Sequence, residues 1–390
     1  MSQLPEVRLT AKGWRWQRTG HPWIYLNDLA VSPPELPGGA WVRVLDHQGR
    51  FLGRACYSAK SRIALRFVTY QDEALDRGFW EKRLKQAWAY RQQVVADTEA
   101  YRLIYGEADG FPGLIVDHYA GHLALQVLHP GMEAVLPEMI DILTEYLTPL
   151  SITLRNDVEV RRLEGLPREV ATVRGELPPL VEVAAGGVRF LVDLRGGQKT
   201  GLFLDQRENH LAAATYAQGE ALDCFSYQGG FALHLARQCK KVTLVESSGA
   251  ALSRAQENAR LNHLDNLEPV KENVFAFLKE AVAQGRRFDC IVLDPPAFAK
   301  SRRDRESAIK GYLEINRRAF QLLNPGGVLI TCSCSYNLSE PEFLEIVRQA
   351  AADAHRQARL IERRGASRDH PALLSLPESL YLKCFILEAQ

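Results

Sequence analysis

The chain has 390 residues, of which 46% are hydrophobic and 24% are charged, and its net charge at pH 7 is +1. This composition is typical of soluble globular proteins and excludes collagen-like and largely disordered chains. No apolar stretch reaches the roughly 18 residues that cross a bilayer, and the first residues do not read as a secretory signal. Seven cysteines at irregular spacing favour reduced thiols and a cytoplasmic location over a disulfide framework.

Short strands separated by turns are predicted for the N-terminal part, residues 7–69. A hairpin is predicted within it, with strands at residues 40–45 and 50–57 around the turn 46–49. We expect a small β-barrel here and place the first domain at residues 1–72.

A second domain begins with a helical apolar spacing over residues 72–98. Further strands and one more helix complete a central α+β domain, which we place at residues 73–185. The strands are predicted at 101–105, 114–116, 123–128 and 151–154, and the helix near 135–147.

Strands and helices alternate from about residue 187 onward. Near-continuous apolar strands between amphipathic helices indicate an α/β domain with a mostly parallel sheet covered on both faces, which we place at residues 186–390. The strands are predicted at 221–225, 241–246, 267–270, 288–294, 327–335 and 380–388.

Acidic residues stand at the ends of three of these strands. Asp223 is followed by the pair Gly229-Gly230, Glu246 ends the next strand, and Asp294 precedes two prolines. In open α/β sheets, ligands bind at the carboxyl ends of the strands where the strand order reverses. One such acid is usually a cap or turn residue, but three together indicate a ligand site.

The charge of this site selects the cofactor. A carboxylate at Asp223 repels a pyrophosphate, and the loop lacks the G-x-G-x-x-G pattern, so a dinucleotide and a dehydrogenase are disfavoured. The cationic cofactor S-adenosylmethionine (SAM) fits instead. Glu246 is expected to accept hydrogen bonds from ribose hydroxyls, and Asn273 to contact adenine.

Positive charge is concentrated in two segments. Residues 8–66 hold ten lysines and arginines against three acids, with aromatic residues interleaved, and residues 300–318 hold seven against three. Clustered cations with flat side chains suit a phosphate backbone with unstacked bases, although a solvated face over a β-core explains such a patch equally well. We expect nucleic-acid contacts from Arg15, Arg62, Arg66, Lys300, Arg302 and Arg303.

Several segments together share the pattern of a known family. They are Asp-Cys-Phe-Ser-Tyr-Gln-Gly-Gly-Phe at 223–231, Asp-Pro-Pro-Ala-Phe-Ala-Lys-Ser at 294–301, Gly-Tyr-Leu-Glu-Ile-Asn at 311–316, Thr-Cys-Ser-Cys-Ser at 331–335, and residues 197–207, 106–114 and 21–23. With these segments the chain resembles the bacterial and archaeal rRNA large-subunit cytosine-C5 methyltransferases. The resemblance implies an N-terminal PUA RNA-binding domain, a central α+β domain and a Rossmann-like class I methyltransferase domain with a seven-stranded sheet. It also implies SAM-dependent methylation of C5 of a cytosine in 23S rRNA.

A cysteine is needed for that chemistry, because C5 of cytosine is a poor nucleophile until a thiolate adds to C6. The resemblance gives this role to Cys334, while Cys332 stays an alternative because residues 332 and 334 share one face of a strand. The pair lacks the second ligand pair that a structural zinc site requires, so no metal is expected. Asp294 is expected to bind the N3/N4 edge of the cytosine.

Other expectations follow from the resemblance. Phe225, Ser226 and Gly229 in the glycine loop, and Gln206 and Arg207 at the end of the segment 197–207, are expected to line the cofactor pocket, although a salt-bridged linker explains the last two nearly as well. The partner is 23S rRNA or the large ribosomal subunit, and a homodimer is compatible with the sequence. Two alternatives stay open: a SAM-dependent N-methyltransferase of rRNA, and a non-catalytic RNA-binding or ribosome-assembly protein.

Overall fold

A computed structural model describes residues 4–31, 36–299 and 302–390 of the chain, which forms two compact units. The first unit comprises Met1–Val183, Val192–Leu202 and Asp369–Ser379, and the second comprises Ala184–Leu191, Phe203–Arg368 and Leu380–Gln390. The chain therefore passes from one unit to the other after Val183, Leu191, Leu202, Arg368 and Ser379. Neither unit is a continuous segment.

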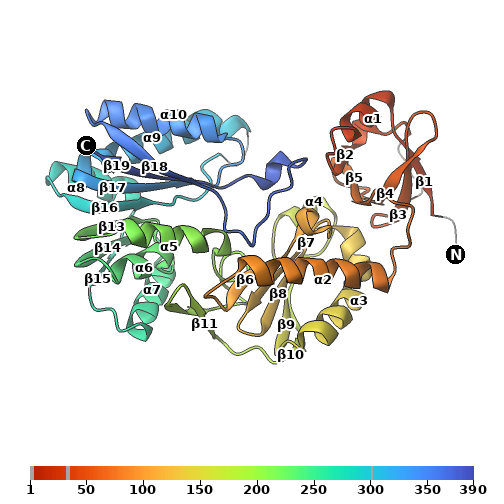
Figure 1. Cartoon of the computed structure of the whole chain (residues 1–390), viewed down its shortest axis with the longest axis horizontal. Coiled ribbons are helices and arrows are strands. Elements are labelled where there is room, and N and C mark those ends of the chain that lie inside the picture. Colours follow the sequence, from red (N-terminus) through yellow and green to blue (C-terminus); the bar gives the residue numbers. More distant parts are fainter. Residues whose placement is uncertain (1–3, 32–35, 300–301) are drawn as a thin grey trace. The chain divides into compact units, whose positions relative to one another are not determined.

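The first unit opens with a five-stranded sheet in the order β1-β3-β4-β5-β2 (Figure 1). The predicted hairpin is confirmed, because β3 pairs antiparallel with β4, with Trp41 opposite Cys56. A short helix, α1, is capped by Thr10, whose side chain accepts a hydrogen bond from the backbone N–H of Gly13. The bounds are β1 Glu6–Arg8, α1 Ala11–Gln17, β2 Trp23–Tyr25, β3 Trp41–Leu45, β4 Phe51–Tyr57 and β5 Ile63–Thr69.

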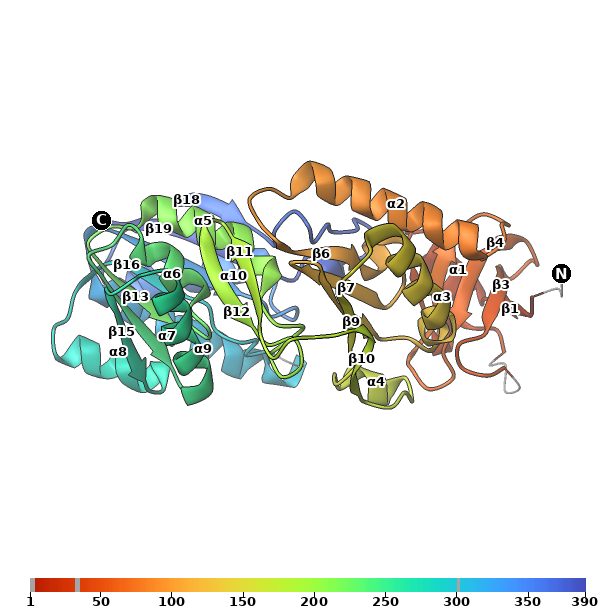
Figure 2. The same cartoon turned by 90° about the horizontal axis from the view of Figure 1, so that it is seen from below.

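A second five-stranded sheet of the first unit has the order β10-β9-β8-β7-β6. Helices α2 and α3 pack on one face of this sheet (Figure 2), where Trp80, Leu84 and Leu143 are completely buried in a shared apolar core. The bounds are α2 Arg77–Val94, β6 Ala100–Tyr105, β7 Leu114–Tyr119, β8 His122–Val127, α3 Pro130–Leu147, β9 Ser151–Arg155, α4 Val160–Leu163 and β10 Val170–Gly175. A two-stranded sheet follows, formed by β11 Val181–Ala185 and β12 Val188–Val192.

The second unit is built on a seven-stranded sheet in the order β15-β14-β13-β16-β17-β19-β18. The strands from β15 to β17 are parallel, and β19 runs antiparallel to both of its neighbours. This confirms the predicted α/β fold with a mostly parallel sheet. The bounds are β13 Glu220–Cys224, β14 Lys241–Glu246, β15 Leu267–Lys271, β16 Phe288–Leu293, β17 Leu323–Ser333, β18 Ala358–Arg364 and β19 Lys383–Ala389.

Helices cover both faces of this sheet (Figure 1). Helices α5, α6 and α7 share one apolar core with the sheet, and α8, α9 and α10 share another. The bounds are α5 Arg207–Tyr216, α6 Gly230–Ala236, α7 Gly249–Leu261, α8 Val274–Ala283, α9 Arg305–Leu322 and α10 Glu340–Asp353. Short 3₁₀ turns lie at Leu26–Asp28, Gly106–Asp109, Leu204–Gln206, Arg302–Asp304 and Pro377–Ser379.

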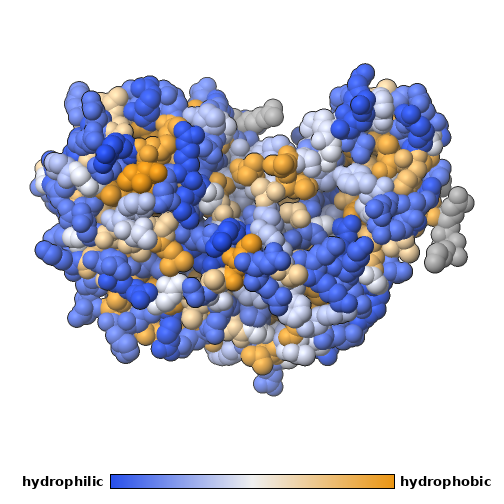
Figure 3. All heavy atoms as spheres, viewed as in Figure 1, coloured by the Kyte–Doolittle hydropathy of each residue, from blue (hydrophilic) through white to orange (hydrophobic). Residues whose placement is uncertain are grey.

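Hydrophobic side chains on the face seen in Figure 3 form scattered patches among hydrophilic ones. Scattered exposure of this kind is normal for folded chains in water. None of the helices in the described residues combines the length and the apolar character that crossing a bilayer requires.

Candidate active site

The centre of the second unit is the point where the strand order reverses. β13 lies between β14 and β16, and the chain proceeds outward from β13 in one direction and from β16 in the other. The loop after β13 turns sharply, with positive φ angles of 62° at Phe225, 49° at Tyr227 and 85° at Gly229. Residues other than glycine rarely adopt positive φ angles. Such strained residues are concentrated at active sites and at sites that bind ligands. The predicted cofactor loop therefore sits at the switch point of the sheet.

Asp223 is the buried acid of this loop. Its Oδ2 accepts hydrogen bonds from Ser226 Oγ at 2.6 Å and from the backbone N–H of Ala232 at 3.0 Å, while its buried Oδ1 has no partner among the described residues. Burial raises the pKa of Asp223 to about 7, against the lowering effect of these two hydrogen bonds, and the charges of Asp294 and Glu246 raise it further. An orphaned oxygen of this kind fits the ammonium group of SAM.

Glu246 shapes the same loop from the end of β14. Its Oε2 accepts a hydrogen bond from the backbone N–H of Tyr227 at 3.0 Å, and its Oε1 accepts one from Ser248 at 2.7 Å. Asn273 caps α8, where its side-chain oxygen accepts from the backbone N–H groups of Phe275 and Ala276. The oxygen of Asn273 is thus engaged in capping, and its predicted adenine contact stays a prediction.

Asp294 follows β16, and Gln206 reaches it from the start of α5. Gln206 Nε2 donates to Asp294 Oδ1 at 2.9 Å, and Gln206 Oε1 accepts from Asn209 Nδ2 at 2.6 Å. Gln206 therefore lies at the candidate site, in contact with Asp294. Arg207 is buried and forms an ion pair with Glu208 at 3.5 Å, and its predicted place in the cofactor pocket stays a prediction.

Two long-range contacts of the segment 205–209 could not be predicted from the sequence. Asn209 extends the hydrogen-bonded chain from Gln206 to Arg364, whose Nε donates to Asn209 Oδ1 at 2.9 Å. Tyr381 donates its hydroxyl to Oδ2 of the buried Asp205 at 2.5 Å. No local sequence pattern predicts these two contacts, because the two residues of each contact lie more than 150 positions apart in the sequence.

The structure separates the two candidate cysteines. Cys332 is completely buried within β17, and burial raises the pKa of its thiol well above the usual range. Cys334 comes just after the end of β17 and is half-buried, with its Sγ 3.9 Å from the carbonyl oxygen of Pro295. Among the seven cysteines, all of which lie in the described part of the chain, only Cys334 is not buried. Cys334 is thus placed beside the residue that follows Asp294.

The predicted RNA-binding arginines do not share one environment. Arg15, Arg62 and Arg303 are exposed, and Lys300 lies outside the described residues. The environment of Arg66 differs from the predicted one. Its side chain is buried in the first unit, where it forms ion pairs with Glu164 at 3.0 Å and Glu107 at 3.4 Å. A guanidinium enclosed by two carboxylates is unavailable to a phosphate, so the predicted RNA contact of Arg66 is wrong. Arg302 lies in the 3₁₀ turn Arg302–Asp304.

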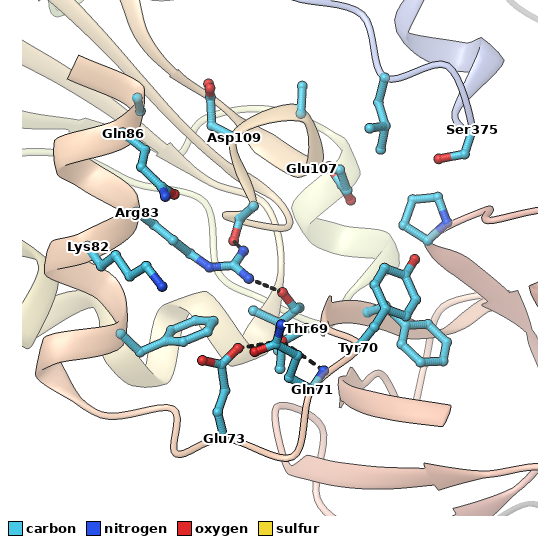
Figure 4. Close-up of a pocket in the computed structure, with 18 of the residues that line it drawn as sticks. Thr69, Tyr70, Gln71, Glu73, Lys82, Arg83, Gln86, Glu107, Asp109 and Ser375 are labelled. Carbon is cyan, nitrogen blue, oxygen red and sulfur yellow. Dashed lines mark hydrogen bonds between the residues drawn. The ribbon is translucent and has the colours of Figure 1, made fainter. Parts of the chain in front are cut away.

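A pocket of about 570 Å³ occurs in the first unit, between the end of β5 and α2 (Figure 4). Arg83 lies across it and donates to the carbonyl oxygens of Gly110 and Val68, each at 2.5 Å, while Thr69 donates to Glu73 at 2.6 Å. Of the described residues that line it, none is a predicted cofactor or catalytic residue. Arg83 thus connects β5, through Val68, to the turn between β6 and β7, through Gly110. We assign this pocket no catalytic role.

Comparison with known proteins supports the same assignment. Residues 7–70 match the model of the PUA-like domain, and residues 168–374 match that of the S-adenosylmethionine-dependent methyltransferase family. Ribosomal RNA large subunit methyltransferase I of Klebsiella pneumoniae (strain 342) is 42% identical over 94% of this chain and 93% of its own length. The protein of the same name from Enterobacter sp. (strain 638) is 40% identical over 94% of each chain.

Solved structures show the same fold. A candidate methyltransferase complexed with S-adenosylhomocysteine (SAH) matches with a TM-score of 0.84 and 20% identity, over 99% of this chain and 100% of that one. A candidate SAM-dependent methyltransferase from Streptococcus mutans matches with the same TM-score and coverage at 21% identity. The chain is a SAM-dependent methyltransferase, and it belongs to the family of ribosomal RNA large subunit methyltransferase I.

Proposed function

We propose that this enzyme methylates C5 of a cytosine in 23S rRNA, with Cys334 as the nucleophile. The names of the relatives support an rRNA of the large subunit as substrate, and the PUA-like domain supports RNA binding. The observation that carries the proposal is the position of Cys334, whose Sγ lies 3.9 Å from the carbonyl oxygen of the residue next to Asp294. Cys334 and Asp294 lie just after the ends of the neighbouring strands β17 and β16, which supports these two roles.

The reaction follows from the residues. The thiolate of Cys334 forms a bond to C6 of the cytosine, and the electron pair of the C5–C6 double bond moves so that C5 becomes nucleophilic. SAM supplies an electrophilic methyl group on a sulfonium, which C5 takes as SAH is released. The C5 proton then leaves to water, the double bond re-forms, and the S–C6 bond breaks to return the thiolate.

Asp294 binds the cytosine in this proposal. A carboxylate that hydrogen-bonds the N3/N4 edge favours protonation of N3, which stabilises the negative charge that thiolate addition delivers to the ring. Gln206 holds Oδ1 of Asp294, so the carboxylate is oriented before the base arrives. The target base must leave its stack to reach the two groups, and the exposed Arg303, in the basic segment that follows Asp294, can contact the flanking phosphates.

The deciding experiment compares Cys334→Ala with Cys332→Ala. We expect Cys334→Ala to abolish transfer of labelled methyl groups to 23S rRNA while calorimetry shows unchanged SAM affinity. Cys332→Ala serves as the matched control and should keep most of the activity, because its thiol is buried inside β17. Full activity of Cys334→Ala would move the assignment to N-methylation, which needs no thiolate.

Two further parts of the proposal concern the state of the enzyme. None of the seven cysteines, all of which lie in the described residues, forms a disulfide, which supports a cytoplasmic enzyme with reduced thiols. The homodimer stays a prediction, and sedimentation of the full chain with and without rRNA checks it.

A further inference from the structure

Lys383 is a buried lysine at the start of β19. Its side chain is enclosed, with 4% of the residue exposed, and its Nζ donates to the carbonyl oxygens of Ser335, Leu338 and Tyr381, each at 2.8 Å. An ammonium group has three N–H donors, so these bonds account for all of them. Two of the acceptors belong to the segment that immediately follows Cys334, which Lys383 thereby fixes.

The charge of Lys383 lacks a carboxylate partner. Among the described residues, no Asp or Glu oxygen lies within the 4.0 Å of an ion pair with Lys383, although an unpaired buried cation is costly. Burial lowers the pKa of Lys383 to about 8. The charge that most strongly opposes this lowering is a thiolate at Cys334, followed by the charges of Glu340 and Glu342 of α10. Lys383 Nζ is bonded to the carbonyl oxygen of Ser335, the residue next to Cys334, so the ammonium and the thiol belong to one charged environment.

Tyr312 of α9 contacts the residues on both sides of Cys334. Its hydroxyl oxygen accepts a hydrogen bond from Ser333 Oγ at 3.0 Å and is 3.0 Å from Ser335 Oγ, which in turn accepts from the backbone N–H of Ala299 at 3.2 Å. Ser333, Ser335 and Tyr312 are all completely buried. The residues on both sides of Cys334 are thus anchored, while Cys334 itself stays half-buried.

We propose that Lys383 is a positioning residue for the methyl transfer, which holds the segment of Cys334 in place and supplies the positive charge that favours its thiolate. The inference rests on the proposed function, since it concerns the nucleophile of that reaction. It also excludes one role for Lys383: an ammonium whose three N–H groups all bind backbone carbonyls has no lone pair with which to remove the C5 proton.

The test measures the thiol directly, without the reaction. Iodoacetamide alkylates the thiolate form, so the rate of Cys334 modification against pH, read by mass spectrometry of its peptide in the full-length protein, gives its pKa. We expect Lys383→Met to raise that pKa by about one unit, which a lost opposite charge produces, and to lower kcat at pH 7 about tenfold with unchanged SAM affinity. Lys383→Arg, which keeps the charge, should restore most of the wild-type profile.

Lys241→Met is the matched control, because Lys241 lies on β14 and pairs at the surface with Glu268 at 2.9 Å. It should leave the alkylation profile unchanged. An unchanged profile in Lys383→Met as well would overturn the inference and reduce Lys383 to a structural lysine.

A reciprocal measurement covers the case in which Lys383→Met does not fold. Coupling between two groups is mutual, so Cys334→Ala should lower the pKa of Lys383, read from the NMR shift of its labelled ε-carbon. An unchanged lysine pKa overturns the inference. The proposed function fails separately, when Cys334→Ala still methylates rRNA.

Discussion

Gln206 donates a hydrogen bond to Oδ1 of Asp294 at 2.9 Å, although the two residues lie 88 positions apart in the sequence. The same amide accepts a hydrogen bond from Asn209, which continues to Arg364 and so connects the candidate site to β18. A buried chain of this kind fixes the direction of a carboxylate more firmly than a single contact does.

Gln206→Ala tests this orientation of Asp294. A hydrogen bond to a charged group contributes roughly 1.5–3 kcal/mol, so its loss should lower kcat about tenfold or more in a methyl-transfer assay with 23S rRNA. Gln284→Ala is the control, because Gln284 makes a similar bond of 2.7 Å to Glu280 on the exposed side of α8. Equal kcat values for the two variants would show that Asp294 does not depend on Gln206.

Asp223→Asn tests the cofactor contact. Asn has the shape of Asp and keeps an oxygen that can accept the hydrogen bonds from Ser226 and Ala232, but it lacks the negative charge. SAM should therefore bind to the variant at least about tenfold more weakly at pH 8. Since the pKa of Asp223 is about 7, wild-type affinity should fall as the pH is lowered from 8 to 6, because the protonated acid no longer attracts the ammonium. Calorimetry over this range should show the dependence in the wild type and not in the variant.

The same substitution should stabilise the cofactor-free enzyme. The pKa of Asp223 is raised from 3.8 in the unfolded chain to about 7, so this group contributes more stability as pH falls from 7 towards 4 and less above pH 7. At pH 8 the wild type therefore holds a costly buried charge that Asn lacks. We expect a higher melting temperature for Asp223→Asn at pH 8 and a smaller difference at pH 5. A lower melting temperature at pH 8 would contradict this account.

Tyr312→Phe tests the anchoring of the two serines separately from the charge of Lys383. The variant removes the hydroxyl that contacts Ser333 and Ser335 and leaves the ring in the core. We expect kcat to fall several-fold while the alkylation pKa of Cys334 changes little. Tyr216→Phe, which removes a hydroxyl bonded to Glu362 at 2.5 Å in the same unit, should leave kcat unchanged.

Arg62→Ala and Arg66→Ala separate RNA binding from folding. Arg62 is exposed, and its loss should weaken binding of an rRNA fragment and reduce the salt dependence of binding. Arg66 stands between Glu107 and Glu164, and breaking a buried ion pair costs about 3–5 kcal/mol of unfolding free energy. Arg66→Ala should therefore lower the melting temperature. A variant that unfolds like the wild type but binds RNA weakly would show instead that Arg66 contacts RNA.

Local sequence patterns sufficed for the parts of the fold that depend on short-range order. The parallel strands and the acids Asp223, Glu246 and Asp294 at their ends could be predicted, because apolar runs and strand-end positions are visible in the sequence. The edge strand β18 was missed, since its exposed alternate positions and charged residues resemble a loop.

Long-range contacts could not be predicted. The alternation of side chains along a strand predicted the same environment for Cys332 and Cys334. The two differ because alternation holds only within a strand, and β17 ends at Ser333, before Cys334. The burial of Arg66 depends on Glu107 and Glu164, which lie 41 and 98 positions away. The contacts of Lys383 could not be predicted either, since its hydrogen-bond acceptors are backbone carbonyl oxygens, which every residue type has.

The five crossings of the chain between its two units limit how the protein can be divided. A single peptide-bond cleavage between residues 203 and 368 leaves residues of both units on each of the two fragments, so we expect such a cut not to release the second unit as a free methyltransferase half. Recombination faces the same obstacle, because no one breakpoint exchanges a whole unit.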